Sequence, residues 1–148
     1  MKKALLIIAS VLCFAAVASA QPRAIGLRAG YGGELSYQHS IGGNSFAEID
    51  LGAWGNSGNN FSFFVTGAYD FIVAGNGACN VYVGPAASLG SWKSDSYSGF
   101  AGGIGGQLGV EYNFSFPLQL SLDYRPIYYF GSKAFYAYGI ALGIRYRF

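Results

Sequence analysis

Side chains that could act as a nucleophile, a base or an acid are few in this chain. His39 is its one histidine, Ser40 follows it, and Glu48 and Asp50 lie a short distance further on. A serine, a histidine and a carboxylate are the groups of a hydrolase that works through an acyl-enzyme. His39, however, falls at the expected end of a strand, where a half-polar ring suits an interface. We therefore expect no catalytic residue and no enzyme activity.

Metal and phosphate chemistry have no better support. His39 and Cys79 lie too far apart in the sequence to show the short spacing of metal ligands. No strand, glycine-rich loop and helix follow one another, which is the order that cradles a phosphate. The sequence thus predicts neither a metal site nor a cofactor.

The charged residues are more informative than these candidates, because most of them share one set of alternate positions. Six carboxylates and four guanidiniums are expected on the same face of successive strands: Arg28, Glu34, Glu48, Asp50, Asp70, Glu111, Asp123, Arg125, Arg145 and Arg147. The planar fork of arginine pairs with a carboxylate at two points, so this set could join opposite walls of a small closed sheet. The alternative is that these charges are wetted by solvent and independent of one another.

Strands must position these side chains, because the long uncharged stretches fail as helices. The stretches 51–69 and 71–92 are long enough to span a bilayer as helices. Both are interrupted by Gly- and Asn-rich runs at 55–60 and 75–77, which are turn signals. Between the turns the apolar residues alternate with period two, as in a strand with one apolar face. Seven segments show this pattern: 24–39, 46–55, 61–73, 81–92, 99–113, 118–130 and 135–148.

Composition decides which face meets water. Of the 148 residues, 18% are aromatic and only 11% are charged, whereas charged residues supply about a quarter of an ordinary soluble domain. The polar face carries no lysine, and large aromatic residues gather at the ends of the apolar face, as they do where a membrane protein meets lipid headgroups. We therefore predict an all-β, antiparallel, up-and-down transmembrane β-barrel with its polar face inward. A secreted soluble β-sandwich that binds a ligand is the alternative.

A barrel in lipid must close on itself, and the seven segments counted above are an odd number of strands. Hydrocarbon cannot hydrogen-bond an open sheet edge, and bacterial barrels have even strand numbers. The longest segment, 24–39, contains Gly30-Tyr31-Gly32-Gly33, so a hairpin near Gly32 would supply the eighth strand. Ile25 and Tyr37 keep one parity across these glycines, which requires either a continuous bent strand or a loop of odd length. We predict about eight strands.

The first twenty residues are typical of a cleaved secretory signal peptide. Lys2 and Lys3 precede an apolar run, and Ala18-Ser19-Ala20 offers small residues for cleavage before Gln21. The barrel domain is then 21–148, in which seven basic residues balance seven acidic ones, so no nucleic-acid partner is expected. Cys13 would be removed with the signal, unless it is the acylated residue of a lipoprotein, and Cys79 is left alone without an internal disulfide.

The C-terminal segment resembles a known family. Its alternating residues end in a phenylalanine and comprise Ile140, Leu142, Ile144, Tyr146 and Phe148. This pattern is similar to the closing strand of bacterial outer-membrane barrels, which the outer-membrane assembly machinery reads. Together with Gly-Leu-Arg-Ala-Gly-Tyr near the start, it makes the chain resemble small OmpX-like proteins and the OmpA transmembrane domain. The resemblance implies export through the periplasm, integration into the outer membrane among its lipids, assembly as a monomer, and no fixed activity.

Orientation follows from placing the C-terminus in the periplasm. The connections at 56–60, 93–98 and 131–134 would then be extracellular, and those at 40–45, 74–80 and 113–117 periplasmic. Because the outer loops are short, a role within the membrane is favoured over adhesion. We expect a structural, envelope-integrity role with a lumen plugged by paired charges. The alternative is a narrow channel or transporter for small, hydrophobic molecules, lined by Phe64, Tyr82 and Trp92.

Overall fold

A computed structural model describes residues 23–55, 61–94, 97–130 and 134–148, and it is built from strands. The strands are β1 (Arg23–Ala29), β2 (Gly33–Gly42), β3 (Ser45–Gly55), β4 (Phe61–Gly75), β5 (Cys79–Ser94), β6 (Tyr97–Asn113), β7 (Leu118–Tyr124), β8 (Ile127–Tyr129), β9 (Ala134–Tyr136) and β10 (Ile140–Arg147). In these residues no helix is long and apolar enough to cross a membrane.

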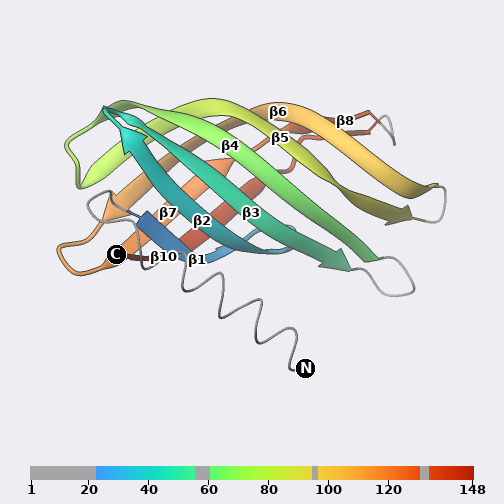
Figure 1. Cartoon of the computed structure of the whole chain (residues 1–148), viewed down its shortest axis with the longest axis horizontal. Helices are drawn as coiled ribbons and strands as arrows, with labels where there is room; N and C mark the ends of the chain where they lie inside the picture. Colours follow the sequence, from blue (N-terminus) through green and yellow to red (C-terminus); the bar gives the residue numbers. More distant parts are fainter. Residues whose placement is uncertain (1–22, 56–60, 95–96, 131–133) are drawn as a thin grey trace.

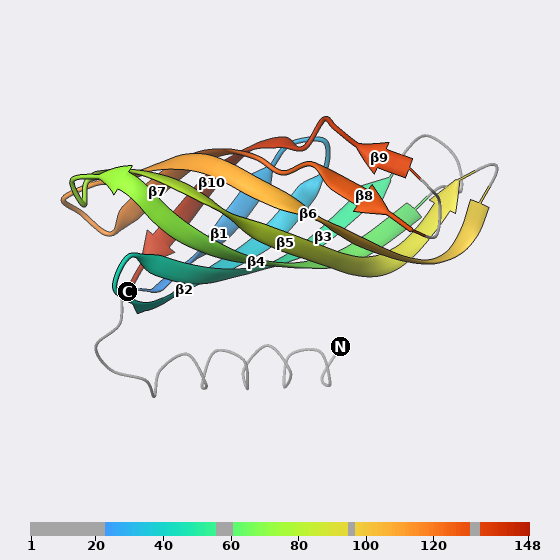
Figure 2. The same cartoon turned by 90° about the horizontal axis from the view of Figure 1, so that it is seen from above.

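The strands form a closed antiparallel barrel. Each of β1 to β6 pairs with the next strand along the chain, β6 pairs with both β7 and β8, and β10 lies between β7 and β1. The ring is shut by β1 and β10, in which Ala24 lies opposite Arg147 and Ala29 opposite Leu142. Figure 1 and Figure 2 show the strands slanting around one long axis. The predicted fold class, an antiparallel up-and-down barrel of eight strands, is confirmed.

The ten strand segments form eight strands of the barrel, because two of these eight strands are each interrupted once. Arg125 and Pro126 separate β7 from β8, and residues 137–139 separate β9 from β10. Proline has no N–H to donate to the ladder, so the pairing breaks there. The two breaks face each other, since the Arg125 N–H donates to the carbonyl of Gly139 at 2.9 Å.

The eighth wall comes from the hairpin near Gly32. Ala29 pairs with Gly33, which leaves a connection of three residues, 30–32. An odd loop keeps the parity of the residues on either side, so Leu27 and Leu35 both point outward, with 60% and 47% of their surface exposed. The hairpin expected within 24–39 is therefore confirmed, together with its odd loop length.

The connections at the end of the barrel that holds the C-terminus are short turns. Gly42 and Gly43 have φ of 105° and 61°, and Gly77 has φ of 85°, a region that glycine adopts without strain. The turn between β6 and β7 covers residues 114–117 at the same end. All three agree with the connections expected on that side. Of those expected on the other side, 56–60 lies outside the described residues, as do parts of 93–98 and 131–134.

The alternation of the sequence becomes an inside and an outside. Over the first ten residues of β4, Phe61 to Asp70, every second side chain is buried and the others are exposed. Most large apolar side chains of the longer strands point outward, apart from a few aromatic ones such as Phe46 and Phe64, whereas most polar ones are buried. This arrangement is the reverse of a soluble domain, whose apolar residues are mostly inside.

One outward assignment was wrong. Tyr136 shares the parity of Tyr138 and Ile140, so the alternation predicts it on the apolar outer face. In the structure Tyr136 lies opposite the buried Ile127 and turns inward, while Phe135 is 63% exposed. The irregular residues 137–139 shift the parity by one position, which a strictly alternating strand cannot anticipate.

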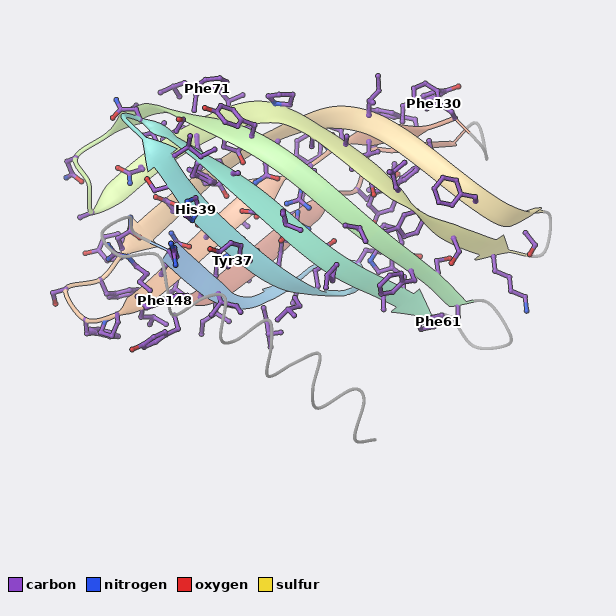
Figure 3. The ribbon with its side chains drawn as sticks, viewed as in Figure 1. Tyr37, His39, Phe61, Phe71, Phe130 and Phe148 are labelled. Atoms are coloured by element: carbon purple, nitrogen blue, oxygen red, sulfur yellow. The ribbon has the colours of Figure 1, made fainter. Side chains whose placement is uncertain are left out.

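Aromatic side chains gather toward the two ends of the outer face. Phe71 and Phe148 lie toward the end that holds the C-terminus, and Phe61 and Phe130 lie toward the other end (Figure 3). Leucine, isoleucine and valine fill the band between them, including Leu51, Val65, Leu108, Leu122 and Leu142. This is the pattern of an apolar belt with an aromatic girdle at each interface.

Candidate functional site: the charged interior of the barrel

Arg125 is the hub of the interior. Its Nη2 donates to Glu48 Oε1 and to Asp50 Oδ2, both at 2.5 Å, and its Nη1 lies 3.5 Å from Glu34 Oε2. Its Nε donates to Gln107 Oε1 at 2.5 Å. Arg125 enters from the break between β7 and β8, whereas Glu48 and Asp50 are on β3, so these bonds cross the barrel from wall to wall.

Two further arginines extend this network of ion pairs around Arg125. Arg28 on β1 donates from Nη1 to Glu34 at 2.7 Å and from Nε to Asp123 at 2.9 Å, with a second bond from Nη2 to the same carboxylate. Arg145 on β10 donates from Nη2 to Glu48 at 3.1 Å. The carboxylate of Glu48 therefore accepts from two guanidiniums, and we call these seven residues the ion-pair layer: Arg28, Glu34, Glu48, Asp50, Asp123, Arg125 and Arg145.

Small and amide side chains complete the ion-pair layer. Arg145 also donates to the hydroxyls of Ser36 and Ser121, at 2.9 and 2.7 Å, and Gln38 donates to Glu48 at 2.6 Å. Gly143 makes room for Arg145, because a Cβ at position 143 would lie 2.8 Å from its Nη1. Buried charges of this kind are tolerated only when they are paired and hydrogen-bonded.

Three of the ten predicted charges stand apart from the ion-pair layer. Glu111 is buried, but its bonds come from the amides of Asn80, Asn113 and Gln119, at 2.9, 3.2 and 3.0 Å. Arg147 is half-buried at the rim and donates to the carbonyl of Phe114 at 3.4 Å. Asp70 is fully buried, and neither of its oxygens has a hydrogen-bond partner. The sequence pattern puts all three on the inner face, as the structure does, but it does not reveal that they differ.

An aromatic cluster lies on the side of the ion-pair layer away from the C-terminus. Trp54 stacks on Tyr136 with ring centroids 5.4 Å apart and lies 4.9 Å from Phe64, which in turn lies 5.2 Å from Tyr129. Phe64 and Tyr129 are each 1% exposed. Phe64 was expected to point inward, and so was Tyr82, which is also buried; the side chain of Trp92 lies outside the described residues.

The rest of the cluster was missed by the sequence analysis. Trp54 stands at an even position beside Glu48 and Asp50, so its parity could have placed it inside. Tyr136 could not be found in this way, because the break at 137–139 reverses its parity.

Among the described residues, an open space lies inside the end of the barrel that holds the C-terminus. There a cavity of about 200 Å³ is lined by polar groups that include Arg23, Arg147 and Glu111, and by the apolar side chains of Phe46 and Ile72. On the other side, beside Trp54 and Tyr136, two spaces are each about 20 Å³, close to the size of one water molecule. The ion-pair layer lies between these spaces and the cavity.

The possible Ser/His/acid set is not assembled. His39 is on the outer face, where its Nδ1 lies 3.3 Å from the hydroxyl of Tyr37, as Figure 3 shows for the two side chains. Glu48 and Asp50 are inside the barrel and bonded to Arg125. In the part of the chain that the structure describes, no three His, Cys, Asp or Glu side chains are grouped to hold a metal ion. Cys79 is exposed with a free thiol.

Comparisons with known proteins agree with the barrel. No family model matches the chain, and no curated protein matches its sequence. The crystal structure of Neisserial surface protein A (NspA) matches with a TM-score of 0.59 and 15% identity, over 86% of this chain and 94% of that one. The Yersinia pestis outer membrane protein Ail, in a phospholipid bilayer nanodisc, matches with a TM-score of 0.52 and 18% identity, over 86% and 98%. The chain therefore has the fold of the small eight-stranded outer-membrane β-barrels.

Proposed function

We propose that the protein is an integral outer-membrane barrel of structural, envelope-integrity type, with a lumen closed by its own side chains. Two features support the membrane location: the apolar outer band between aromatic girdles, and the similarity of the fold to the outer membrane protein Ail. Contact with acyl chains explains why Leu142, for example, is 65% exposed. A monomer satisfies this arrangement, because β1 to β7 and β10 each pair with a neighbour on both sides and so offer a partner no free edge along the closed ring.

The observation that carries the closed lumen is the ion-pair layer. Arg125 reaches carboxylates on the opposite side of the barrel, Arg28 pairs with Asp123, and Arg145 pairs with Glu48. An eight-stranded barrel has an interior just wide enough for side chains to fill. Water and ions would have to displace several buried, charge-assisted hydrogen bonds to pass.

Planar-bilayer recordings test this proposal. We expect the purified protein to show no steady, large conductance, and proteoliposomes that contain it not to swell in small sugars. A double variant that removes the hub and one partner, Arg125→Ala with Glu48→Ala, should raise the conductance well above that of the wild type. A steady, large conductance of the wild-type protein would contradict the plugged lumen and favour the channel or transporter.

We also propose that the outer-membrane assembly machinery recognises the chain by its C-terminal strand. Phe148 is 47% exposed at the end of the outer face, and its backbone pairs with Arg23. We expect Phe148→Ser to reduce the folded fraction in cells several-fold, as measured by the heat-modifiable mobility of the barrel in membrane extracts. Phe71→Ser is the matched control, because Phe71 is 49% exposed near the same end of the outer face but not in the last strand.

A second measurement separates assembly from stability. Both variants are refolded from urea into detergent, where no machinery is present. If Phe148→Ser refolds as well as Phe71→Ser but accumulates less in cells, the last strand acts as a signal. An equal deficit in both settings would mean that Phe148 contributes only to stability.

A further inference from the structure

The charges inside the barrel do not balance. In and beside the ion-pair layer, the guanidiniums of Arg28, Arg125 and Arg145 face five buried or nearly buried carboxylates: Glu34, Glu48, Asp50, Asp70 and Asp123. Arg23, Arg147 and Glu111 lie further away, around the cavity at the C-terminal end. The middle of the barrel thus holds two more acidic than basic side chains. An excess of charge in an enclosed space of low dielectric is costly unless something neutralises it.

Asp70 is where the excess is concentrated. Its side chain is fully buried, and both carboxylate oxygens lack a hydrogen-bond donor. The charges that act on it come from Glu48, Asp123 and Asp50, which are negative, and from Arg125, which is positive. A buried carboxylate without any partner is rare in native proteins and indicates a water, an ion or a functional role.

The surroundings of Asp70 include a second unsatisfied oxygen. Asp70 lies opposite Phe46 in the sheet, and the ring of Phe46 packs edge-on against Tyr82 with centroids 5.2 Å apart. The hydroxyl of Tyr82 is buried without a hydrogen-bond partner, and Asp70 is among the charges that act on it. Gly109 leaves the space for this hydroxyl, since a Cβ there would fall against the Tyr82 ring.

The cavity at the C-terminal end reaches close neighbours of Asp70, although Asp70 itself does not line it. The next inward residue on β4 is Ile72, and Ile72, Phe46 and Asn80 line the 200 Å³ cavity. The cavity has room for several waters, so a hydrated ion can approach the layer in which Asp70 lies.

We propose that Asp70 is the anionic ligand of a site for a small monovalent cation, sodium or potassium, that enters through this cavity. One unpaired carboxylate carries one charge, which a monovalent ion neutralises, and the Tyr82 hydroxyl is a neutral oxygen in the same neighbourhood. Hard cations prefer carboxylate, hydroxyl and water oxygens of this kind. The site reduces the excess charge of the interior and makes the stability of the folded barrel depend on the ion.

Unfolding in different salts tests the site. The barrel is unfolded by urea in detergent at one pH, in sodium chloride, potassium chloride or N-methyl-D-glucamine chloride at equal ionic strength. An ion present at ten times its dissociation constant raises the folded-to-unfolded ratio about 11-fold. We expect this gain with sodium or potassium, and no gain with N-methyl-D-glucamine, which is too large for the site.

Asp70→Asn identifies the ligand. The amide has the shape of the acid without its charge, so we expect the variant to fold and to unfold at the same urea concentration in all three salts. Glu111→Gln is the matched control, because Glu111 also lies inside but is already bonded by three amides, and its dependence on the ion should equal that of the wild type. An ion dependence that persists in Asp70→Asn, or a wild type without any, would overturn the proposal. A wild-type barrel that responds to pH but not to the ion would also overturn it, since Asp70 would then hold a proton.

Diffraction provides a readout that does not involve stability. Crystals grown in rubidium chloride should show an anomalous peak beside Asp70 in the wild type and in Glu111→Gln, and none there in Asp70→Asn. An interior without such a peak in the wild type would contradict the site.

Discussion

Replacement of Arg125 by alanine is expected to lower the free energy of unfolding by about 3–5 kcal/mol, which is the usual cost of removing one partner of a buried ion pair. The reason is that Glu48 and Asp50 lose their 2.5 Å contacts with the guanidinium, while both carboxylates stay buried. Urea unfolding of the barrel in detergent or lipid vesicles, followed by tryptophan fluorescence, measures the change.

Two controls distinguish a lost hub from a lost side chain. In Arg125→Ala combined with Asp50→Asn, one uncompensated charge is removed, so part of the lost stability should return. Arg147→Ala removes a half-buried arginine at the rim and should change the free energy of unfolding by less than about 1 kcal/mol. If Arg125→Ala were as mild as Arg147→Ala, the charges would be independent and wetted.

The second large effect is expected on the outer face. Val65→Arg places a charge on β4 between Phe61 and Phe63 on one side and Tyr69 and Phe71 on the other. If that face contacts lipid, arginine near the midplane should cost about 2–4 kcal/mol of unfolding free energy in a bilayer. Unfolding from lipid vesicles by urea gives the value.

Val73→Arg is the matched control for this change. It is the same substitution on the same strand, but Val73 lies beyond Phe71 toward the end of the barrel and is 60% exposed. Near the interface the cost should fall to about 0–1 kcal/mol. Equal, small costs at both positions would contradict a lipid-facing band, because a surface in water accepts arginine anywhere.

Alternation in the sequence is enough to predict the fold and the direction of most side chains. In β4, Val65 and Asp70 are five residues apart and so point to opposite faces, as in any regular strand. Even the hairpin in 24–39 could be inferred, because bacterial barrels have even strand numbers and Gly30-Tyr31-Gly32-Gly33 offers a turn. The parity that Leu27 and Leu35 share did not favour the hairpin, but the three-residue loop preserves it. What failed was Tyr136, where the irregular segment 137–139 changes the parity.

The partners of the inner charges could not be predicted in this way. Parity places Asp70, Asp50 and Glu111 inside, yet Asp50 bonds to Arg125, Glu111 bonds only to amides, and Asp70 bonds to nothing. These differences depend on distances across the barrel, which follow from how the strands are tilted and staggered around the axis. A single sequence contains no direct sign of those distances.

The pairing of β1 with β10 also governs how the barrel can form. Ala24 and Arg147 are more than a hundred residues apart along the chain, and closing so long a loop is entropically costly and slow. Until β10 has been synthesised and has paired, β1 has an open edge that can join with another exposed strand and aggregate. The ring can therefore close only after β10 has been synthesised, although β1 is made near the start.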